Sequence, residues 1–207
     1  MNLANKLTIT RICLVPLFIV FTELHTFWFS IFALAVFCIA SLTDMLDGQI
    51  ARRNNIITPL GIFLDPLADK LLISAAFICF IDVEVLCIPA WMVIAIISRE
   101  FMITGLRSIA ASKNIIIPAD KAGKFKTTSQ IVVIILVLMV LIIHEYFMKY
   151  YGITPQLIAT FDNGSYSTLA SVMHRIPYWA TLAATAMTIY SGVHYMWKHR
   201  GLLQENA

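Results

Sequence analysis

The sequence predicts an all-helical membrane protein with six transmembrane helices. Of its 207 residues, 59% are hydrophobic and only 13% are charged, against about 25% charged residues in ordinary soluble domains. The mean hydropathy is +0.81, and long stretches of the chain carry no charge. These observations exclude a soluble globular domain, a disordered chain and a nucleic-acid-binding module.

Uncharged runs predict the number of membrane-spanning helices. Residues 26–43, 127–143 and 176–197 form runs of 18, 17 and 22 residues, and a helix needs about 20 apolar residues to cross a bilayer. The shorter runs 12–22, 71–81 and 85–98 reach that length only with flanking charged residues. Such charges are costly unless they face a wet cavity or a partner. We therefore expect six spans in one domain, residues 1–207.

The distribution of Lys and Arg predicts the orientation. With six spans, both termini lie on one side, and that side holds 13 of the 15 Lys and Arg residues; the exceptions are Lys149 and Arg175. The positive-inside rule places this side in the cytoplasm. There it would attract anionic lipid or a phosphorylated substrate. The stretch from Tyr150 to Arg175 is predicted to be a loop on the opposite side, with room for a short interfacial helix.

Two pairs of aspartates lie where the second and third predicted helices meet. Asp44 and Asp47 are three residues apart and Asp65 and Asp69 are four apart, so each pair shares a helical face. A short connection lets the helices pack antiparallel, and the pairs then converge. Four carboxylates repel one another, and their oxygen atoms suit two divalent ions, Mg²⁺ or Mn²⁺. Two such ions can hold the attacking and leaving oxygens of a phosphoryl transfer.

Turn-forming residues accompany these aspartates. We expect Pro59 and Gly61 in the connection and Pro66 in the first turn of the third helix, where its missing N–H costs nothing. The whole stretch reads Asp44-x2-Asp47-Gly48-x2-Ala51-Arg52-x8-Gly61-x3-Asp65-x3-Asp69. Helix caps and ion pairs would explain a single aspartate pair. A chance match to all eight positions has a probability of about 10⁻⁸ at usual residue frequencies.

This pattern resembles the motif of the CDP-alcohol phosphotransferases, six-helix membrane enzymes that transfer a phosphatidyl or similar group from a CDP-linked donor to an alcohol and release CMP. The resemblance implies that Asp44, Asp47 and Asp65 are metal ligands. It implies that Asp69 is the general base and also a metal contact. The residues expected to bind the CDP-linked donor are Asn5, Thr8, Gly48, Ala51, Arg52 and Gly61.

Simpler roles exist for the donor residues. Gly48 and Ala51 leave room for a base or a ribose beside the helix, or they serve ordinary packing between membrane helices. The spacing Asn5-x2-Thr8-x2-Arg11 resembles the family's amino-terminal element beside the nucleotide phosphates. Its residue chemistry is also compatible with an interfacial cap and an Arg that extends to the membrane surface.

A group of cations follows the fourth run. Arg99, Arg107, Lys124 and Lys126 are expected to bind an acceptor phosphate at the cytoplasmic mouth. The alternative is that they only flank the spans as positive-inside residues. Arg99 lies deep enough to need a partner. Glu100 comes one residue later, about 100° around the helix, and is not expected to be that partner.

The motifs resemble in particular the branch of the family that acts on sn-glycerol 3-phosphate. They are Asp65-Pro66-Leu67-Ala68-Asp69-Lys70, Arg99-Glu100, Leu106-Arg107 and Gly123-Lys124-x-Lys126-Thr127. The resemblance implies transfer of a phosphatidyl group from CDP-diacylglycerol to sn-glycerol 3-phosphate, which yields phosphatidylglycerophosphate and CMP. It implies a multi-pass protein of the bacterial inner membrane, surrounded by membrane lipid, with its site facing the cytoplasm.

Three other functions remain open: one within the family, one in another enzyme family and one that is not enzymatic. Within the family, the rival is a CDP-diacylglycerol-dependent cardiolipin synthase, whose motif region is much the same. Outside it, a polyprenyl transferase also uses aspartate-bound magnesium, but on a longer chain with different motifs. A non-enzymatic cation carrier would keep its carboxylates near mid-membrane. Family members are often homodimers, and no dimer face is evident in this sequence.

Overall fold

Six long helices make up most of the part of the chain that the structure describes. The computed structural model describes residues 3–54, 59–112, 121–152 and 165–198. Within these ranges there is no strand, which confirms the all-helical prediction. The elements are α1 (Leu3–Glu23), α2 (Phe27–Asn54), α3 (Pro59–Cys79), the 3₁₀ turn η1 (Glu84–Leu86), α4 (Ala90–Ser112), α5 (Lys121–Tyr151) and α7 (Ser165–Lys198).

Two predicted boundaries were wrong. Helix α3 begins at Pro59, so Pro59 and Gly61 belong to its first turn and Pro66 lies seven residues further in. Proline suits the first helical position because its missing N–H has no partner there in any helix. Helix α7 begins at Ser165, so the predicted loop does not extend to Arg175. The uncharged run begins only at Ile176, whereas the helix already extends through residues 165–175, which end in His174 and Arg175.

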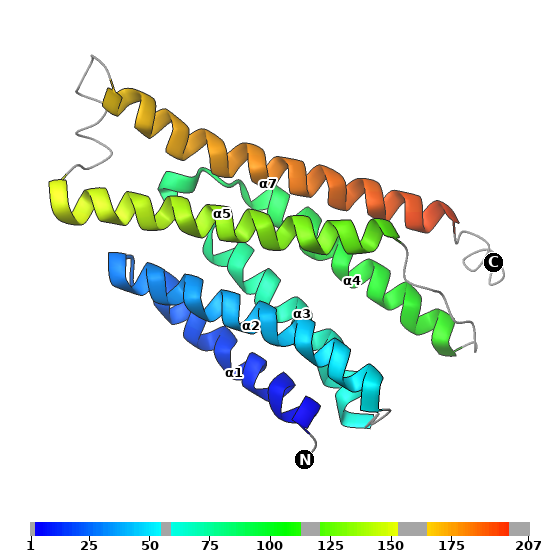
Figure 1. Cartoon of the computed structure of the whole chain (residues 1–207). Coiled ribbons are helices and arrows are strands. Elements are labelled where there is room, and N and C mark those ends of the chain that lie inside the picture. The colour runs from blue at the N-terminus through cyan, green and yellow to red at the C-terminus, as the bar shows by residue number, and fades with distance from the viewer. Residues whose placement is uncertain (1–2, 55–58, 113–120, 153–164, 199–207) are drawn as a thin grey trace.

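The helices form a bundle in which α1 and α7 each join two neighbours (Figure 1). Helix α1 packs along α2 and α3. The side chains at the end of α2 and the start of α3 are outside the described part, so the predicted convergence of the two aspartate pairs stays a prediction. Helix α7 packs along α4 and α5. One end of the bundle holds the start of α1, the end of α2, the start of α3, the end of α4, the start of α5 and the end of α7. We call it the motif end.

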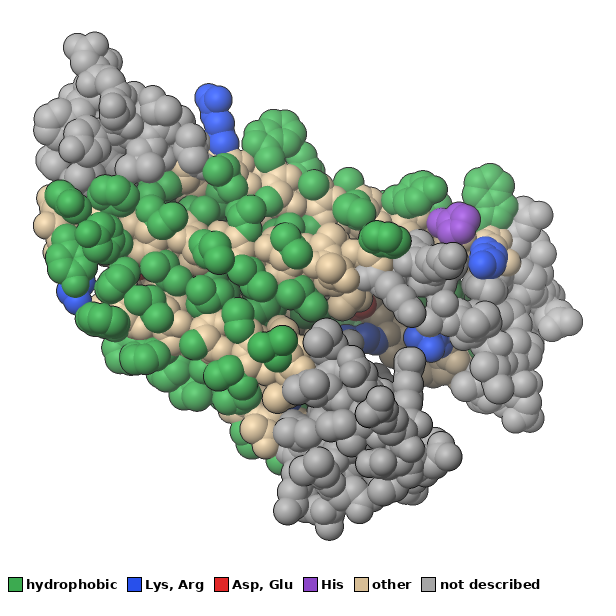
Figure 2. Space-filling view, viewed as in Figure 1, with side chains coloured by type: hydrophobic (Ala, Val, Ile, Leu, Met, Phe, Trp, Pro, Cys, Tyr) green, Lys and Arg blue, Asp and Glu red, His purple; other side chains and the backbone are tan. Residues whose placement is uncertain are grey.

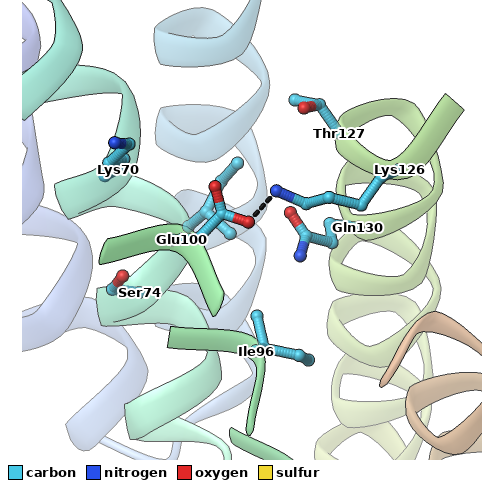
Figure 3. Close-up of a pocket in the computed structure, with 8 residues that line it drawn as sticks. Lys70, Ser74, Ile96, Glu100, Lys126, Thr127 and Gln130 are labelled. Atoms are coloured by element: carbon cyan, nitrogen blue, oxygen red, sulfur yellow. Dashed lines mark ion pairs between the residues drawn. The ribbon is translucent and has the colours of Figure 1, made fainter. Parts of the chain in front are cut away.

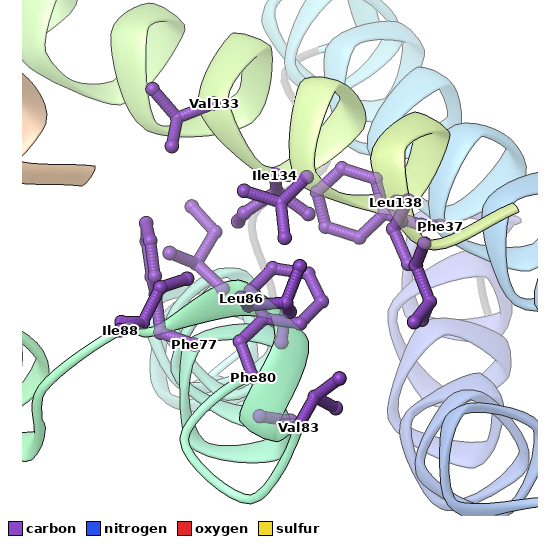
Figure 4. Packing of buried hydrophobic residues seen from close by; sticks show 14 of the residues in the cluster. Phe37, Phe77, Phe80, Val83, Leu86, Ile88, Val133, Ile134 and Leu138 are labelled. Atoms are coloured by element: carbon purple, nitrogen blue, oxygen red, sulfur yellow. The ribbon is translucent and has the colours of Figure 1, made fainter. Parts of the chain in front are cut away.

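The apolar core fills the bundle away from the motif end. Phe37 of α2, Phe77 and Phe80 of α3, Leu86 of η1 and Leu138 of α5 are fully buried and pack together (Figure 4). The turn η1 closes this region from the side of the bundle opposite to the motif end. Buried polar side chains occur along the bundle, and those of Thr8, Arg11 and Lys126 lie towards the motif end, where the motif positions lie.

Large apolar side chains cover the outer surface of every long helix (Figure 2). Examples are Val20, Ile39, Ile78, Ile94, Val132 and Val193. A soluble monomer rarely exposes so much contiguous apolar surface. Among the described residues, only Phe125–Tyr151 is by itself long and apolar enough to cross a bilayer, whereas Phe27–Thr43 and Lys70–Cys79 are shorter apolar segments. Length and composition alone therefore support one crossing helix.

Candidate active site

The four motif aspartates occupy helical positions near the motif end. Asp44 and Asp47 lie towards the end of α2, and Asp65 and Asp69 lie in the first half of α3. Their side chains are outside the described part of the structure, so the metal-ligand set stays a prediction. The described side chains contain no group of three His, Cys, Asp or Glu residues that could hold a metal ion. Four carboxylates carried to one end of a bundle are nonetheless a donor set that fits Mg²⁺ or Mn²⁺.

The other predicted donor residues lie on the same two helices and on α1. Gly48, Ala51 and Arg52 follow the first aspartate pair on α2, and Gly61 precedes the second pair on α3. The side chains at these positions are not described. The same holds for the side chain of Asn5 on α1.

Thr8 and Arg11 show which face of α1 is polar. Thr8 is 1% exposed and Arg11 is 2% exposed, and their spacing of three residues places them on one face. An Arg that extended to the membrane surface would not be buried in this way. Because α1 packs along α2 and α3, this face belongs to the interior of the bundle. The burial favours a role beside the motif over a role as an interfacial anchor.

A small polar pocket lies between α3, α4 and α5, next to the motif (Figure 3). Asp69 directly precedes Lys70, one of the lining residues, and position 69 lies one helical turn before Ile73, another of them. The lining residues are Lys70, Ile73 and Ser74 of α3, Ile96 and Glu100 of α4, and Lys126, Thr127 and Gln130 of α5.

The pocket has two layers, because each helix supplies a pair of lining residues four positions apart. The pairs are Lys70 with Ser74, Ile96 with Glu100, and Lys126 with Gln130. Helices α3 and α5 start at the motif end and α4 finishes there. The charged member of each pair therefore lies nearer the motif end. The other member lies about 6 Å deeper, given the rise of a helix. We call these levels the charged layer and the floor.

An ion pair crosses the charged layer. The Lys126 ammonium contacts the Glu100 carboxylate, and the two side chains are only 4% and 14% exposed. Figure 3 shows this contact at the centre of the pocket. Burial of either charge alone would be costly, and the contact offsets this cost for both side chains. An ammonium has three N–H donors, so Lys126 can contact more than one acceptor at this level.

Arg99 points towards α7 and does not line the pocket. Its Nη2 donates to Ser191 Oγ at 2.8 Å, and its Nη1 lies 3.5 Å from Glu100 Oε1. The expectation that Glu100 would not contact Arg99 was therefore wrong, although this contact is long. Gly192 of α7 makes room for Arg99, because a Cβ atom there would lie 2.8 Å from Arg99 Cγ.

The predicted acceptor cations thus separate in space. Lys126 lines the pocket. Arg107 is exposed on α4, seven residues after Glu100, and lies about 10 Å further towards the motif end at the rise of a helix. The side chain of Lys124 is outside the described part. Their roles in phosphate binding stay predictions.

Of the eight lining residues, only Lys126 was predicted as a site residue. Lys70 and Thr127 were noted only as parts of motifs. Glu100 was noticed only as a neighbour of Arg99, and Ser74 and Gln130 lie inside uncharged runs. A signal was present in the sequence. Ser74 and Gln130 each follow a Lys by four residues, the spacing that continues one helical face.

Comparison with known proteins adds to this geometry. A sequence profile of the CDP-alcohol phosphatidyltransferase family matches residues 1–185. The chain belongs to this family. The match covers the motif and every residue that lines the pocket. Membership in an enzyme family makes the chain a transferase and removes the cation carrier from consideration.

Relatives in the family carry specific names. Over 145 residues, 64% of this chain and 74% of the relative, the sequence is 44% identical to the CDP-diacylglycerol--glycerol-3-phosphate 3-phosphatidyltransferase of Bacillus subtilis. It is 37% identical to the enzyme of the same name from Rickettsia bellii, over 62% of this chain and 70% of the relative. It is 34% identical to a cardiolipin synthase (CMP-forming) of rice, over 67% of this chain and 46% of the relative.

Proposed function

We propose that this CDP-alcohol phosphatidyltransferase transfers the phosphatidyl group of CDP-diacylglycerol to sn-glycerol 3-phosphate, with release of CMP. The single observation that carries the acceptor assignment is the pocket beside the motif, which combines the buried Lys126 and the half-buried Lys70 with hydroxyl and amide groups. A small phosphorylated polyol complements these groups, because its phosphate suits the cations and its hydroxyl groups suit the hydroxyl and amide groups. The names of the Bacillus and Rickettsia relatives support the same reaction.

We further propose that all six long helices cross the bacterial inner membrane, with the motif end at the cytoplasm. The apolar side chains exposed on every helix support this arrangement. At the opposite end, the Lys149 ammonium lies 5.8, 5.3 and 5.4 Å from the ring centroids of Phe27, Trp28 and Tyr150. Aromatic rings with a cation of this kind are typical of a membrane–water interface. The bilayer then lies between these rings and the pocket.

The motif residues bind the donor in this proposal. Two divalent ions held by Asp44, Asp47, Asp65 and Asp69 would neutralise the diphosphate and stabilise the departing CMP oxygen. The buried face of α1 with Thr8 and Arg11 adds a hydroxyl and a positive charge beside the same phosphates. Gly48 and Ala51 leave space for the nucleoside. The acyl chains stay in lipid.

The acceptor is activated by Asp69 and held by the charged layer. The Asp69 carboxylate takes the proton of the C1 hydroxyl, and the resulting oxygen attacks the phosphorus that bears diacylglycerol. The bond between this phosphorus and the CMP oxygen breaks as the new bond forms. Lys126, whose ammonium contacts Glu100, binds the acceptor phosphate through a charge-assisted hydrogen bond. Arg107 and Lys124 supply further positive charge near the entrance. Arg99, which points towards α7, acts through its contact with Glu100.

The product of the purified protein tests this function. The protein is given CDP-diacylglycerol with sn-glycerol 3-phosphate, phosphatidylglycerol, serine or inositol phosphate, and the lipid product and released CMP are identified. We expect phosphatidylglycerophosphate, and CMP only when both substrates are present. Cardiolipin as the main product would keep the family and replace the acceptor, as the rice relative suggests. The Asp69→Asn variant is the matched control for enzyme-dependent release.

A further inference from the structure

Gln130 is a buried polar residue that the proposed reaction does not use. It lies on α5, within the segment Phe125–Tyr151 that is apolar enough to cross a bilayer, and it is 1% exposed. It forms part of the floor of the pocket, one turn deeper than Lys126. A buried amide in such a segment is costly unless its polar atoms are satisfied.

A relay of hydrogen bonds to α7 fixes the orientation of the Gln130 amide. The Thr188 hydroxyl donates its one hydrogen to the carbonyl oxygen of Ala184 at 2.7 Å. It can therefore only accept from Gln130, whose Nε2 lies 3.2 Å from Thr188 Oγ1. The amide nitrogen thus faces α7, and the oxygen Oε1 faces the other way. Figure 3 shows this oxygen directed towards Glu100 and the Lys126 ammonium.

The floor therefore presents an oriented hydrogen-bond acceptor inside an anion-binding pocket. The phosphate of an acceptor substrate cannot hydrogen-bond to this oxygen, because a phosphate dianion has only acceptor atoms. A hydroxyl group has a hydrogen to donate. The floor residue Ile96 and the wall residue Ile73 provide no polar atom. The remaining floor residue, Ser74, carries a hydroxyl that can donate as well as accept, so among the floor side chains described Gln130 Oε1 is the atom that can only accept.

We infer that Gln130 selects the acceptor by accepting a hydrogen bond from its middle hydroxyl, the C2 hydroxyl of sn-glycerol 3-phosphate. This inference rests on the proposed function. The phosphate and the reacting C1 hydroxyl both belong at the charged layer, near Lys126 and position 69. A three-carbon chain with both ends at that level bends its middle carbon towards the floor. Gln130 is then a specificity-determining residue, and Thr188 is a positioning residue that acts through it.

A substrate that lacks only the C2 hydroxyl tests the inference. The analogue is 3-hydroxypropyl phosphate, which keeps the phosphate and the reacting alcohol. The measurement is the ratio of kcat/KM for sn-glycerol 3-phosphate to that for the analogue. For the wild type we expect a ratio of about ten- to a hundredfold, the effect of one buried hydrogen bond. In Gln130→Met, which has a similar shape and no strong acceptor, the ratio should fall to within about threefold of one.

Two variants of Thr188 separate orientation from simple packing. Thr188→Val keeps the shape and removes the hydroxyl, so the amide is free to turn and the ratio should fall. Thr188→Ser keeps the hydroxyl, so the ratio should stay near that of the wild type. This pair of variants still decides the matter if Gln130→Met does not fold. The KM for CDP-diacylglycerol should stay unchanged in all three variants.

The outcomes distinguish the two levels of the proposal. A wild-type enzyme that forms no phosphatidylglycerophosphate overturns the proposed function and this inference with it. A wild-type enzyme that forms the product but uses both acceptors equally overturns the inference alone. If the ratio of kcat/KM values in Gln130→Met stays at the wild-type level, the inference alone is also overturned, because another group would then bind the C2 hydroxyl. If Gln130→Met does not fold, the same result in Thr188→Val overturns it.

Discussion

Replacing Gly192 of α7 by alanine should destabilise the protein, and the reason is its contact with α4. A Cβ atom at this position would lie 2.8 Å from Arg99 Cγ, 3.6 Å from Arg99 Nε and 3.8 Å from Arg99 Cδ. The Arg99 side chain would have to move, and its hydrogen bond to Ser191 Oγ would be strained or lost. Gly105 of α4 is the matched control, because a Cβ atom there meets nothing within 4 Å.

The expected change in stability on replacement by alanine has opposite signs at Gly105 and Gly192. Exchange of Gly for Ala inside a helix stabilises it by about 1 kcal/mol, so Gly105→Ala should raise the midpoint of thermal unfolding by about 2–4 °C for a chain of this size. At Gly192 the same gain is opposed by overpacking, about 1–3 kcal/mol, and by loss of a charged hydrogen bond, about 1.5–3 kcal/mol. The net loss is about 1.5–5 kcal/mol, so the midpoint should fall by at least about 3 °C.

The midpoint of thermal unfolding measures these changes. All variants are compared in one detergent and at one scan rate, because the midpoint of an irreversible transition depends on the scan rate. The Arg99→Ala background provides the decisive comparison. Without the Arg99 side chain, Gly192→Ala should stabilise the protein as Gly105→Ala does, and the difference is the coupling energy of the pair. A Gly192→Ala protein that melts at or above the Gly105→Ala protein would show that Arg99 does not pack on this glycine.

Further predictions concern the reaction. Chelators should abolish CMP release, Mg²⁺ or Mn²⁺ should restore it, and Asp44→Asn should remain inactive; turnover in excess chelator would contradict a two-ion site. Asp69→Asn should lower kcat by about 10²–10⁴-fold with little effect on donor binding, and near-normal turnover would mean that another group is the base. Lys126→Ala should raise the KM for sn-glycerol 3-phosphate by about ten- to a hundredfold and Arg107→Ala by less, because Arg107 is exposed; a matching loss of donor affinity would place Lys126 on the diphosphate.

The helices could be predicted from the sequence because apolar runs dominate it. Apart from residues 26, 80 and 81, five of the six runs lie within one long helix each, and the sixth, 85–98, enters its helix, α4, only at Ala90, after the 3₁₀ turn η1. The ends were less predictable, since a helix continues into polar sequence that carries no apolar signal. Pro59 and Ser165 both begin helices within stretches that were expected to be connections. The motif could be recognised because its spacing follows a helical face within one segment, which is local information.

The pocket could be predicted only in part, because it depends on contacts between distant segments. The sequence places Arg99, Lys126 and Arg107 in one cluster of cations. It does not say that Arg99 turns to Ser191, which lies 92 residues away. Nor does it say that Lys126 meets Glu100. These directions follow from the way α4 packs against α7 and α5, and no motif in the sequence records that packing.

The site has a donor half and an acceptor half, and a different helix holds each of them in place. Helix α1 packs along α2 and α3, which carry the motif aspartates, so it holds the donor half. Helix α7 supplies no residue to the pocket, yet it fixes the acceptor half through two contacts: Ser191 holds Arg99 on α4, and Thr188 holds Gln130 on α5. Glu100 then joins α4 to α5 through Lys126. Substitutions on this face of α7 should therefore change how the acceptor is used while donor binding, which depends on α1, stays the same.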